Sequence, residues 1–369
     1  MSESSKIPDR RSFLKAVGAG SIASLSGCIG GNLLGGGGET GPLRVGVFGG
    51  IFKEMYTKAF FKPYEEQTGN ELKIEPIGNV PQILKLKKQV QQGNPPVDVL
   101  VQSTEALAKG LANDIYQPFS VNDVPNVKHN YERYRTKQGG NYYGAGVSAW
   151  FQAMIINTNK IDQPPTSWKA WWDDRYKNQM EPSSVLADAY FPWLAGMLYF
   201  DEGESLLSTK SGIDKAYKKM QGTKPQIKSF YKNEAQGQAD MRKGKVGILQ
   251  MWADVSEVMT RRNKEFKRIL PEEGWIGDHG EWTLLKGSEK QQKAFDFMNF
   301  TLEPKQQRKL SSMLFTAPAV KNANLSDKLR QVVFGGRKPS GHINFDYKYL
   351  YNHQSYMNSQ WNKFITGAA

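Results

Sequence analysis

The sequence predicts an α/β protein with a mainly parallel sheet, divided into two domains. Strand-like and helix-like segments alternate along the chain, which is the pattern of βαβ units. The chain has 369 residues, which is too many for one ordinary core and enough for two. Hydrophobic residues make up 39% and charged residues 23% of the chain, so the body should fold and bury apolar surface.

The alternation fixes where a ligand should bind. The expected strands are 43–48, 72–77, 97–101, 149–156 and 246–251. The expected helices are 52–67, 80–92, 105–112, 167–172, 185–199 and 291–302. Because ligands bind beyond the carboxyl ends of parallel strands, the loops at 49–50, 102–104 and 251–254 are expected to carry the site.

The N-terminus reads as an export signal, predicted to span residues 1–27. Two arginines at 10–11 are followed by a serine, a phenylalanine and a leucine, which is close to the twin-arginine pattern. The apolar stretch 16–29 is too short to span a bilayer. It ends at Leu25-Ser26-Gly27-Cys28, which resembles a lipobox, so Cys28 is expected to carry lipid and hold the protein at the extracytoplasmic face of the cytoplasmic membrane. Residues 28–42 read as a glycine-rich tether.

The charge of the chain is +13, and it stays at +11 when residues 1–27, with four basic and two acidic residues, are removed. A basic body can attract nucleic acid or anionic lipid, and charge alone does not choose between them. The basic residues are spread along the chain rather than gathered in one tract with aromatics, so no nucleic-acid partner is expected. We expect a monomer.

The residues that usually carry chemistry are scarce. Cys28 is the only cysteine, so no intramolecular disulfide can form, and the four histidines show no His-x-x-x-His spacing. The chain has no Gly-x-Ser-x-Gly elbow and no Walker-type loop. We therefore expect no metal, no cofactor and no enzymatic activity, and an exported hydrolase is the weaker alternative.

Several motifs, in order, resemble the family 1 extracellular solute-binding proteins, especially the spermidine/putrescine-binding branch. The likeness covers roughly residues 43–320. The stretches that carry it include Lys62-Pro63-Tyr64-Glu65-Glu66-Gln67-Thr68-Gly69, Pro96-Val97-Asp98-Val99, Tyr143-Gly144-Ala145-Gly146, Pro165-Thr166-Ser167-Trp168, Lys243-Gly244-Lys245-Val246, Lys286-Gly287-Ser288, Phe297-Met298-Asn299-Phe300 and Phe315-Thr316-Ala317-Pro318. The resemblance implies a type II periplasmic-binding-protein fold, with two lobes joined by hinge-crossing strands. It also implies that the protein captures a small solute and delivers it to the permease of an ABC importer.

The resemblance further suggests where the lobes begin and end. Crossings near 146–150, 275–281 and 317–320 would give lobe 1 the residues 43–148 and 278–318. Lobe 2 would then contain residues 149–277 and 319–369. Closure of the two lobes over the ligand would set its affinity.

The loops after the predicted strands supply the candidate ligand-binding residues. Trp252 can hold a cation over its ring and Asp254 can pair with an ammonium, although packing and helix capping are the alternatives. Trp150 near the first crossing can stack on a ligand or pack the hinge. Ser103 and Thr104 are hydrogen-bond donors or helix caps.

Five further candidates complete the predicted site. Gly50 ends the turn after the first strand, Ser183 precedes a helix in a position suited to an anion, and Asp188 lies one turn further on. Asp278 and Glu281 stand where polyamine binders carry Trp-x-Asp, but in a different register. The resemblance favours a polyamine-like cation, and because of that difference an anionic solute, such as a phosphonate, a sulfonate or an opine-like acid, stays open.

Overall fold

The computed structural model describes residues 39–77, 82–336, 342–343 and 347–367. Residues 39–369 form one compact unit. The predicted signal peptide 1–27 and Cys28 lie outside the described residues, as does most of the predicted tether.

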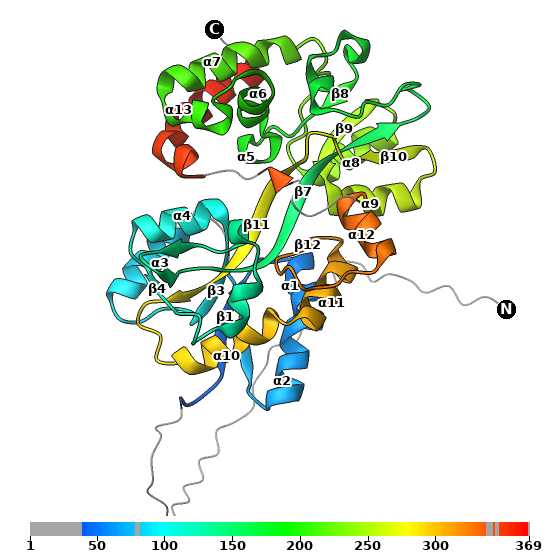
Figure 1. Ribbon diagram of the computed structural model, residues 1–369. Coiled ribbons are helices and arrows are strands. Elements are labelled where there is room, and N and C mark those ends of the chain that lie inside the picture. Colours follow the sequence, from blue (N-terminus) through cyan, green and yellow to red (C-terminus); the bar gives the residue numbers. More distant parts are fainter. Residues whose placement is uncertain (1–38, 78–81, 337–341, 344–346, 368–369) are drawn as a thin grey trace, which may run out of the picture. The chain divides into compact units, whose positions relative to one another are not determined.

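One large mixed sheet runs through this unit (Figure 1). Its main path follows the order β2–β1–β3–β11–β7–β9–β8. These strands are β1 (Leu43–Val47), β2 (Leu72–Pro76), β3 (Val99–Ser103), β7 (Ala145–Asn157), β8 (Met180–Glu181), β9 (Ile248–Trp252) and β11 (Trp275–Leu285). The short strands β4 (Tyr116–Gln117), β10 (Phe266–Ile269), β12 (Ala317–Pro318) and β13 (His342–Ile343) pair with β7 or β11, and β5 (Lys137–Gln138) and β6 (Asn141–Tyr142) form a separate two-stranded sheet.

The prediction of a mainly parallel sheet is only partly right. β1 pairs in parallel with both β2 and β3, and β8 pairs in parallel with β9. The centre is antiparallel, because β11 runs against both β3 and β7, and β7 runs against β9. β11, the strand that makes most of this difference, was expected only as a crossing segment near 275–281.

The helices flank the sheet. The thirteen described are α1 (Ile51–Tyr56), α2 (Lys62–Thr68), α3 (Ile83–Gln91), α4 (Thr104–Ala112), α5 (Leu186–Ala189), α6 (Phe191–Tyr199), α7 (Lys210–Met220), α8 (Glu234–Arg242), α9 (Ala253–Arg262), α10 (Gln291–Thr301), α11 (Pro304–Leu314), α12 (Asp327–Phe334) and α13 (Tyr347–Thr366). Seven of them, α1 to α6 and α10, lie where the periodicity predicts a helix. A π-helical segment, η1 (Thr57–Phe61), joins α1 to α2, so the predicted helix 52–67 is continuous in the chain. None of the described helices has the length and apolar character needed to cross a membrane.

Two of the predicted helices differ from the structure. The segment 167–172 forms only a 3-10 turn, η5 (Trp168–Trp172). The predicted helix 185–199 is wrong as a single helix, because Tyr190 adopts a left-handed conformation with φ of 56° that ends α5 and begins α6. Hydrophobic periodicity does not register such a break, since it continues on both sides of Tyr190.

Two large apolar cores lie along the large sheet, beside three smaller clusters of buried residues in the described chain. One contains β1, η1 and the buried face of α10, and the other contains α6, α7 and residues Met357, Trp361 and Phe364 of α13. β7 contributes Val147 to the first core and Met154 to the second. β11 does the same with Trp282 and Ile276, so both long strands belong to both cores.

Glu39 is hydrogen-bonded to the first turn of α10. Its carboxylate accepts hydrogen bonds from the backbone N–H groups of Gln292 (2.8 Å) and Lys293 (2.9 Å). These are free donors in the first turn of α10, whose own N-cap residue, Lys290, makes no side-chain cap. Glu39, four residues before β1, is thus bound to the N-terminus of α10.

A buried asparagine joins the segments that cross near residues 146 and 319. The Asn130 side chain accepts a hydrogen bond from the Gly146 N–H and donates to the carbonyl oxygens of Gly146 and Ala319, each at 3.1 Å. Asn130 is fully buried, so water cannot replace these bonds if the amide is removed.

We expect Asn130→Ala to lower the free energy of unfolding by about 2–3 kcal/mol, because it leaves buried backbone groups without partners. Urea denaturation checks this value, with the exposed Asn122→Ala as a control that should change stability by less than about 0.5 kcal/mol. Equal stabilities for the two variants would contradict the role of Asn130.

Candidate ligand-binding site

A cavity of about 480 Å³ lies where the strand ends meet. Its walls include Phe48 and Gly49 after β1, Ser103 at the end of β3, and Trp252 at the end of β9. These are the three loops that the position of the strand ends predicts. Between them lie Trp150 of β7 and Asp278 of β11, which are paired across the two strands.

Aromatic rings cover two sides of the cavity. Phe48, Phe52 and Trp150 contact one another edge to face, with ring centroids 5.6–6.1 Å apart. Tyr190 and Trp252 form a second edge-to-face pair at 6.2 Å. Such faces can contact an apolar chain or hold a cation.

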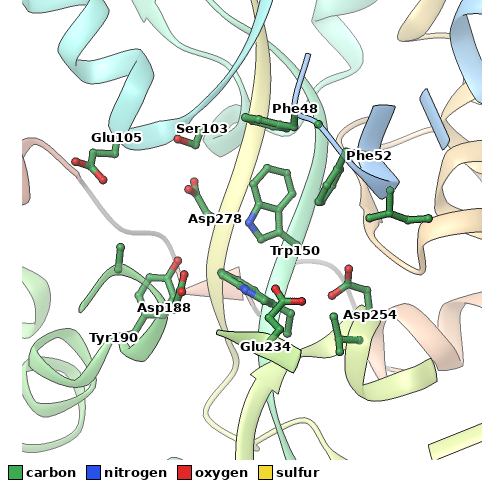
Figure 2. A pocket seen from close by; sticks show the side chains of 15 residues that line it. Phe48, Phe52, Ser103, Glu105, Trp150, Asp188, Tyr190, Glu234, Asp254 and Asp278 are labelled. Carbon is green, nitrogen blue, oxygen red and sulfur yellow. The ribbon is translucent and has the colours of Figure 1, made fainter. Parts of the chain in front are cut away.

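Three carboxylates face these rings from three different helices. Asp188 belongs to α5, Glu234 begins α8 and Asp254 lies in the first turn of α9. Figure 2 shows all three on the side of the cavity opposite Phe48 and Phe52, with Trp150 between. Asp254 Oδ1 is buried and has no hydrogen-bond partner in the described part of the chain.

Burial and mutual repulsion disfavour the charged forms of these carboxylates. Burial, together with the neighbouring Glu234 and Asp278 carboxylates, raises the pKa of Asp188 to about 6, against a hydrogen bond with Ser183 that lowers it. Burial raises the pKa of Asp254 to about 6 as well, against hydrogen bonds from backbone N–H groups that lower it. Glu234 is exposed to solvent, and the partial burial of its carboxylate against the protein still raises its pKa. A bound cation would relieve this repulsion.

Two more carboxylates in the lining already have protein partners. Asp278 Oδ1 accepts hydrogen bonds from the backbone N–H of Thr104 (3.2 Å), from the Thr104 hydroxyl and from the backbone N–H of His279 (2.7 Å). Glu105 pairs with Lys109 at 2.8 Å and accepts a hydrogen bond from the Gln354 amide of α13. The Asp278 and Glu105 carboxylates thus line the cavity and are held in position by hydrogen bonds within the protein.

The structure brings six of the ten predicted ligand-binding residues into the lining: Ser103, Trp150, Asp188, Trp252, Asp254 and Asp278. The other four lie outside it. Gly50 has a φ of 63° at the N-cap of α1, which favours glycine, and Thr104 binds Asp278 as the first residue of α4. Ser183 is buried and accepts a hydrogen bond from the Val185 N–H.

Glu281, the fourth, points away from the cavity. Its carboxylate accepts hydrogen bonds from the Thr136 N–H (2.8 Å) and hydroxyl (3.1 Å), and it lies 2.8 Å from His279 Nε2. Gly144 leaves the space for it, because a Cβ there would come within 2.0 Å of the carboxylate. A strand alternates its faces, and Glu281 shares the face of His279 rather than that of Asp278.

Several lining residues were not singled out from the sequence: Phe48, Phe52, Glu105, Tyr190 and Glu234. Phe48 and Phe52 flank the glycine turn that was expected to carry the site, so their positions in the sequence could have identified them as lining residues. Glu234 begins a helix that was not predicted. Among the described residues, no group of three or more His, Cys, Asp or Glu side chains is arranged to hold a metal ion.

Residues 59–332 match the family model for bacterial extracellular solute-binding proteins. The chain belongs to this family. The assignment confirms the resemblance found in the sequence, and it makes the protein a solute-binding component of an ABC transporter rather than an enzyme. It also places this solute-binding protein outside the cytoplasm.

Individual relatives agree with the fold and differ in their ligands. The γ-aminobutyric acid-binding protein of Pseudomonas aeruginosa is 22% identical over 291 residues, which cover 77% of this chain and 78% of that protein. An extracellular solute-binding protein from Bordetella parapertussis superposes with a TM-score of 0.75 at 19% identity, over 87% of this chain and 98% of the other. The spermidine/putrescine-binding protein PotD of Streptococcus pneumoniae superposes with a TM-score of 0.69 at 16% identity, over 88% and 100%. These likenesses confirm a periplasmic-binding-protein fold.

The raised pKa of Asp254 has a consequence for stability. An acid whose pKa is higher in the folded protein than in the unfolded chain binds its proton more tightly when folded. Its stabilising contribution is therefore present at low pH and is lost as the pH rises from about 4 to about 6.

We expect Asp254→Asn to stabilise the ligand-free protein more at about pH 7.5 than at about pH 4.5, by a difference on the order of 2 kcal/mol. Urea denaturation at both pH values measures it, with the exposed Asp201→Asn as the matched control. The same stabilisation at both pH values would show that burial does not penalise the Asp254 carboxylate.

Proposed function

We propose that this solute-binding protein captures a small organic cation with at least one ammonium group, a polyamine-like solute, for its ABC importer. One observation carries the proposal: the cavity lining contains five carboxylates and five aromatic rings, while none of its fifteen residues is Lys, Arg or His. Carboxylates and aromatic faces are the groups that bind ammonium in proteins.

Three of the carboxylates suit an ammonium group in particular. A primary ammonium has three N–H donors, and Asp188, Glu234 and Asp254 offer acceptors from three helices. The rings of Phe48 and Phe52 on the other side would contact the methylene chain that such a cation carries. Charge and apolar contact are thus divided between the two sides of the cavity.

The N-terminus of α4 argues against an anionic solute. A helix N-terminus is the natural position for an anionic group, because its N–H groups and dipole attract negative charge. Here the Thr104 N–H already donates to Asp278, and Glu105 stands in the same turn. A phosphonate, sulfonate or opine-like acid, or the carboxylate of an amino acid such as γ-aminobutyrate, would meet five like charges.

The arrangement around the cavity fits closure of two lobes, 43–148 with 278–318 and 149–277 with 319–369. β7 and β11 pass from one core to the other, and the cavity lies beside them at Trp150 and Asp278. A cation would draw the carboxylates of one side towards the aromatic rings of the other. We further propose export by the twin-arginine route, with lipid on Cys28 as the anchor, and a monomer in solution.

We expect thermal unfolding of the purified protein to shift upward with 1,4-diaminobutane or spermidine and to stay unchanged with methylphosphonate, taurine or γ-aminobutyrate. A ligand at about a hundred times its dissociation constant adds about 2.7 kcal/mol of stability, enough to move the midpoint. A shift only with methylphosphonate, taurine or γ-aminobutyrate, each of which carries an acidic group, would refute the proposed cation.

We expect Glu234→Gln to weaken binding of the amine that gives the shift by about tenfold to a hundredfold, since one charge-assisted hydrogen bond contributes about 1.5–3 kcal/mol. Isothermal titration calorimetry measures the change. Glu202→Gln, also exposed but outside the lining, is the control and should bind as the native protein does. Unchanged affinity of Glu234→Gln would remove this carboxylate from the site.

A further inference from the structure

The helix α13 is hydrogen-bonded to the cavity wall at two places. The Gln354 amide donates to Glu105 Oε1 in α4, and Glu105 lines the cavity. Seven residues later, the Trp361 indole N–H donates to the Ser184 carbonyl oxygen at 2.7 Å. Ser184 comes two residues before α5, the helix that carries the lining carboxylate Asp188. One helix therefore holds both α4 and the start of α5.

The two helices that it holds belong to different groups of buried residues. α4 buries Ala106 and Leu107 in a small cluster with α3. α13 instead buries Met357, Trp361 and Phe364 in the large core that contains α6 and α7. Figure 1 shows one end of α13 beside α4, while the rest of it lies with α7. The Gln354 bond thus connects two parts of the protein that pack separately.

The spacing of residues along α13 explains how one helix reaches both parts. Four residues stand at positions i, i+3, i+7 and i+10, which form one stripe of a helix: Gln354, Met357, Trp361 and Phe364. The three apolar members are buried, and Gln354 continues the stripe beyond the core to α4. Gln354 and Trp361 are separated by about 10 Å along the helix axis. In Figure 2, Glu105 lies on the upper side of the cavity and Asp188 on the lower side.

α13 is held to the large core by contacts that do not involve Gln354. The Tyr217 hydroxyl of α7 donates to the Met357 carbonyl oxygen at 2.8 Å. α13 bends at His353, where φ is −124°, and His353 Nε2 donates to the carbonyl oxygen of Ser208, two residues before α7, at 2.9 Å. A substitution at Gln354 should therefore release α4 and leave α13 in place on the core.

The Glu105 carboxylate can hold α13 and a ligand at the same time. Lys109 and Gln354 both donate to its Oε1 atom. Among the hydrogen bonds of the described residues, none reaches Oε2, so this oxygen can accept from an ammonium group.

We propose that α13 is a strap that joins α4 to the large core beside the cavity, limits how far the cavity opens, and holds Glu105 in position through Gln354. The strands β7 and β11 also connect the two sides, but strands that cross between two bodies can act as a hinge. A bond placed to one side of such a hinge resists rotation about it. The restraint on opening is independent of the ligand, whereas the effect on binding rests on the proposed capture of a cation.

The first test measures opening in the ligand-free protein by double electron–electron resonance. Spin labels are attached at two exposed positions, Lys85→Cys on α3 and Lys218→Cys on α7, in a chain whose native thiol is removed by Cys28→Ser. We expect Gln354→Ala to move the label separation to longer values and to broaden it, because α4 is no longer joined to α13. A distribution identical to that of the native side chain would overturn the proposal, whatever the protein binds.

Gln360→Ala is the matched control. Gln360 is an amide of the same helix with similar exposure, and it donates to Asp214 of α7 and to the Tyr356 hydroxyl, both on the side of the large core. Its removal should leave the label separation as in the native protein.

An exchanged pair tests whether Gln354 and Glu105 act through their mutual bond. Glu105→Ala alone should lengthen the label separation as Gln354→Ala does. The double variant Glu105→Gln/Gln354→Glu keeps one amide and one carboxylate at the contact, so the native separation should return. If the exchanged pair is as open as the alanine variants, then the bond is not the restraint and the strap is refuted.

Calorimetry with 1,4-diaminobutane tests the effect on binding. In Gln354→Ala we expect affinity to fall about threefold to tenfold, since Glu105 is no longer held and the open form is favoured. Gln360→Ala should bind as the native protein does, and native affinity in Gln354→Ala would refute the role of Gln354 in positioning Glu105. If the native protein binds no amine, the cation proposal fails, and the label separations still decide whether α13 is a strap.

Discussion

The antiparallel pairing of β7 with β11 is the constraint on which the rest of the structure depends. These strands give buried residues to both apolar cores, so neither core is complete without them. Their register also sets Trp150 directly opposite Asp278, which puts an aromatic ring and a carboxylate side by side at the cavity. A slip of one residue would turn one of these side chains to the opposite face. The binding chemistry is therefore tied to the same hydrogen bonds that hold the cores together.

The cavity gathers several carboxylates, and two of them, Asp188 and Asp254, are largely shielded from water. Asp188 and Asp254 have pKa values near 6 because burial and neighbouring carboxylates oppose their ionisation. A protein optimised only for stability would avoid this arrangement, since like charges in low dielectric repel. In a binding protein this repulsion between carboxylates is useful. A cation that enters the cavity neutralises it, and the loss of repulsion adds to the affinity for the cation.

The sequence predicts the ends of β1, β3 and β9 well, because apolar runs followed by glycine or polar residues mark where a strand stops. Those ends lead directly to Ser103, Trp252 and Asp254. It does not predict residues that reach the cavity through tertiary packing. Glu234 begins an unpredicted helix of weak amphipathic pattern, and Tyr190 enters the site only because the chain turns left-handed within an apolar stretch.

Glu281 is the opposite case, a residue that the sequence placed in the site and the structure does not. A carboxylate three residues from Asp278 was expected to share its role, but strand geometry sends the two to different surroundings. A pattern of charges in the sequence records which residues are present, and the pleat of the strand determines which of them a ligand can meet. The two long strands are mostly buried on both faces, so an alternation of buried and exposed residues could not assign the faces in advance.

The hydrogen bonds between Glu39 and the first turn of α10 have a mechanical consequence. Tension applied through the N-terminal end of the described chain is delivered first to α10 and to β1, which begins four residues later. Both elements belong to one apolar core, and neither pairs with β7. A pull at this end would therefore load that one core first and would not act directly on β7, which passes between the two cores.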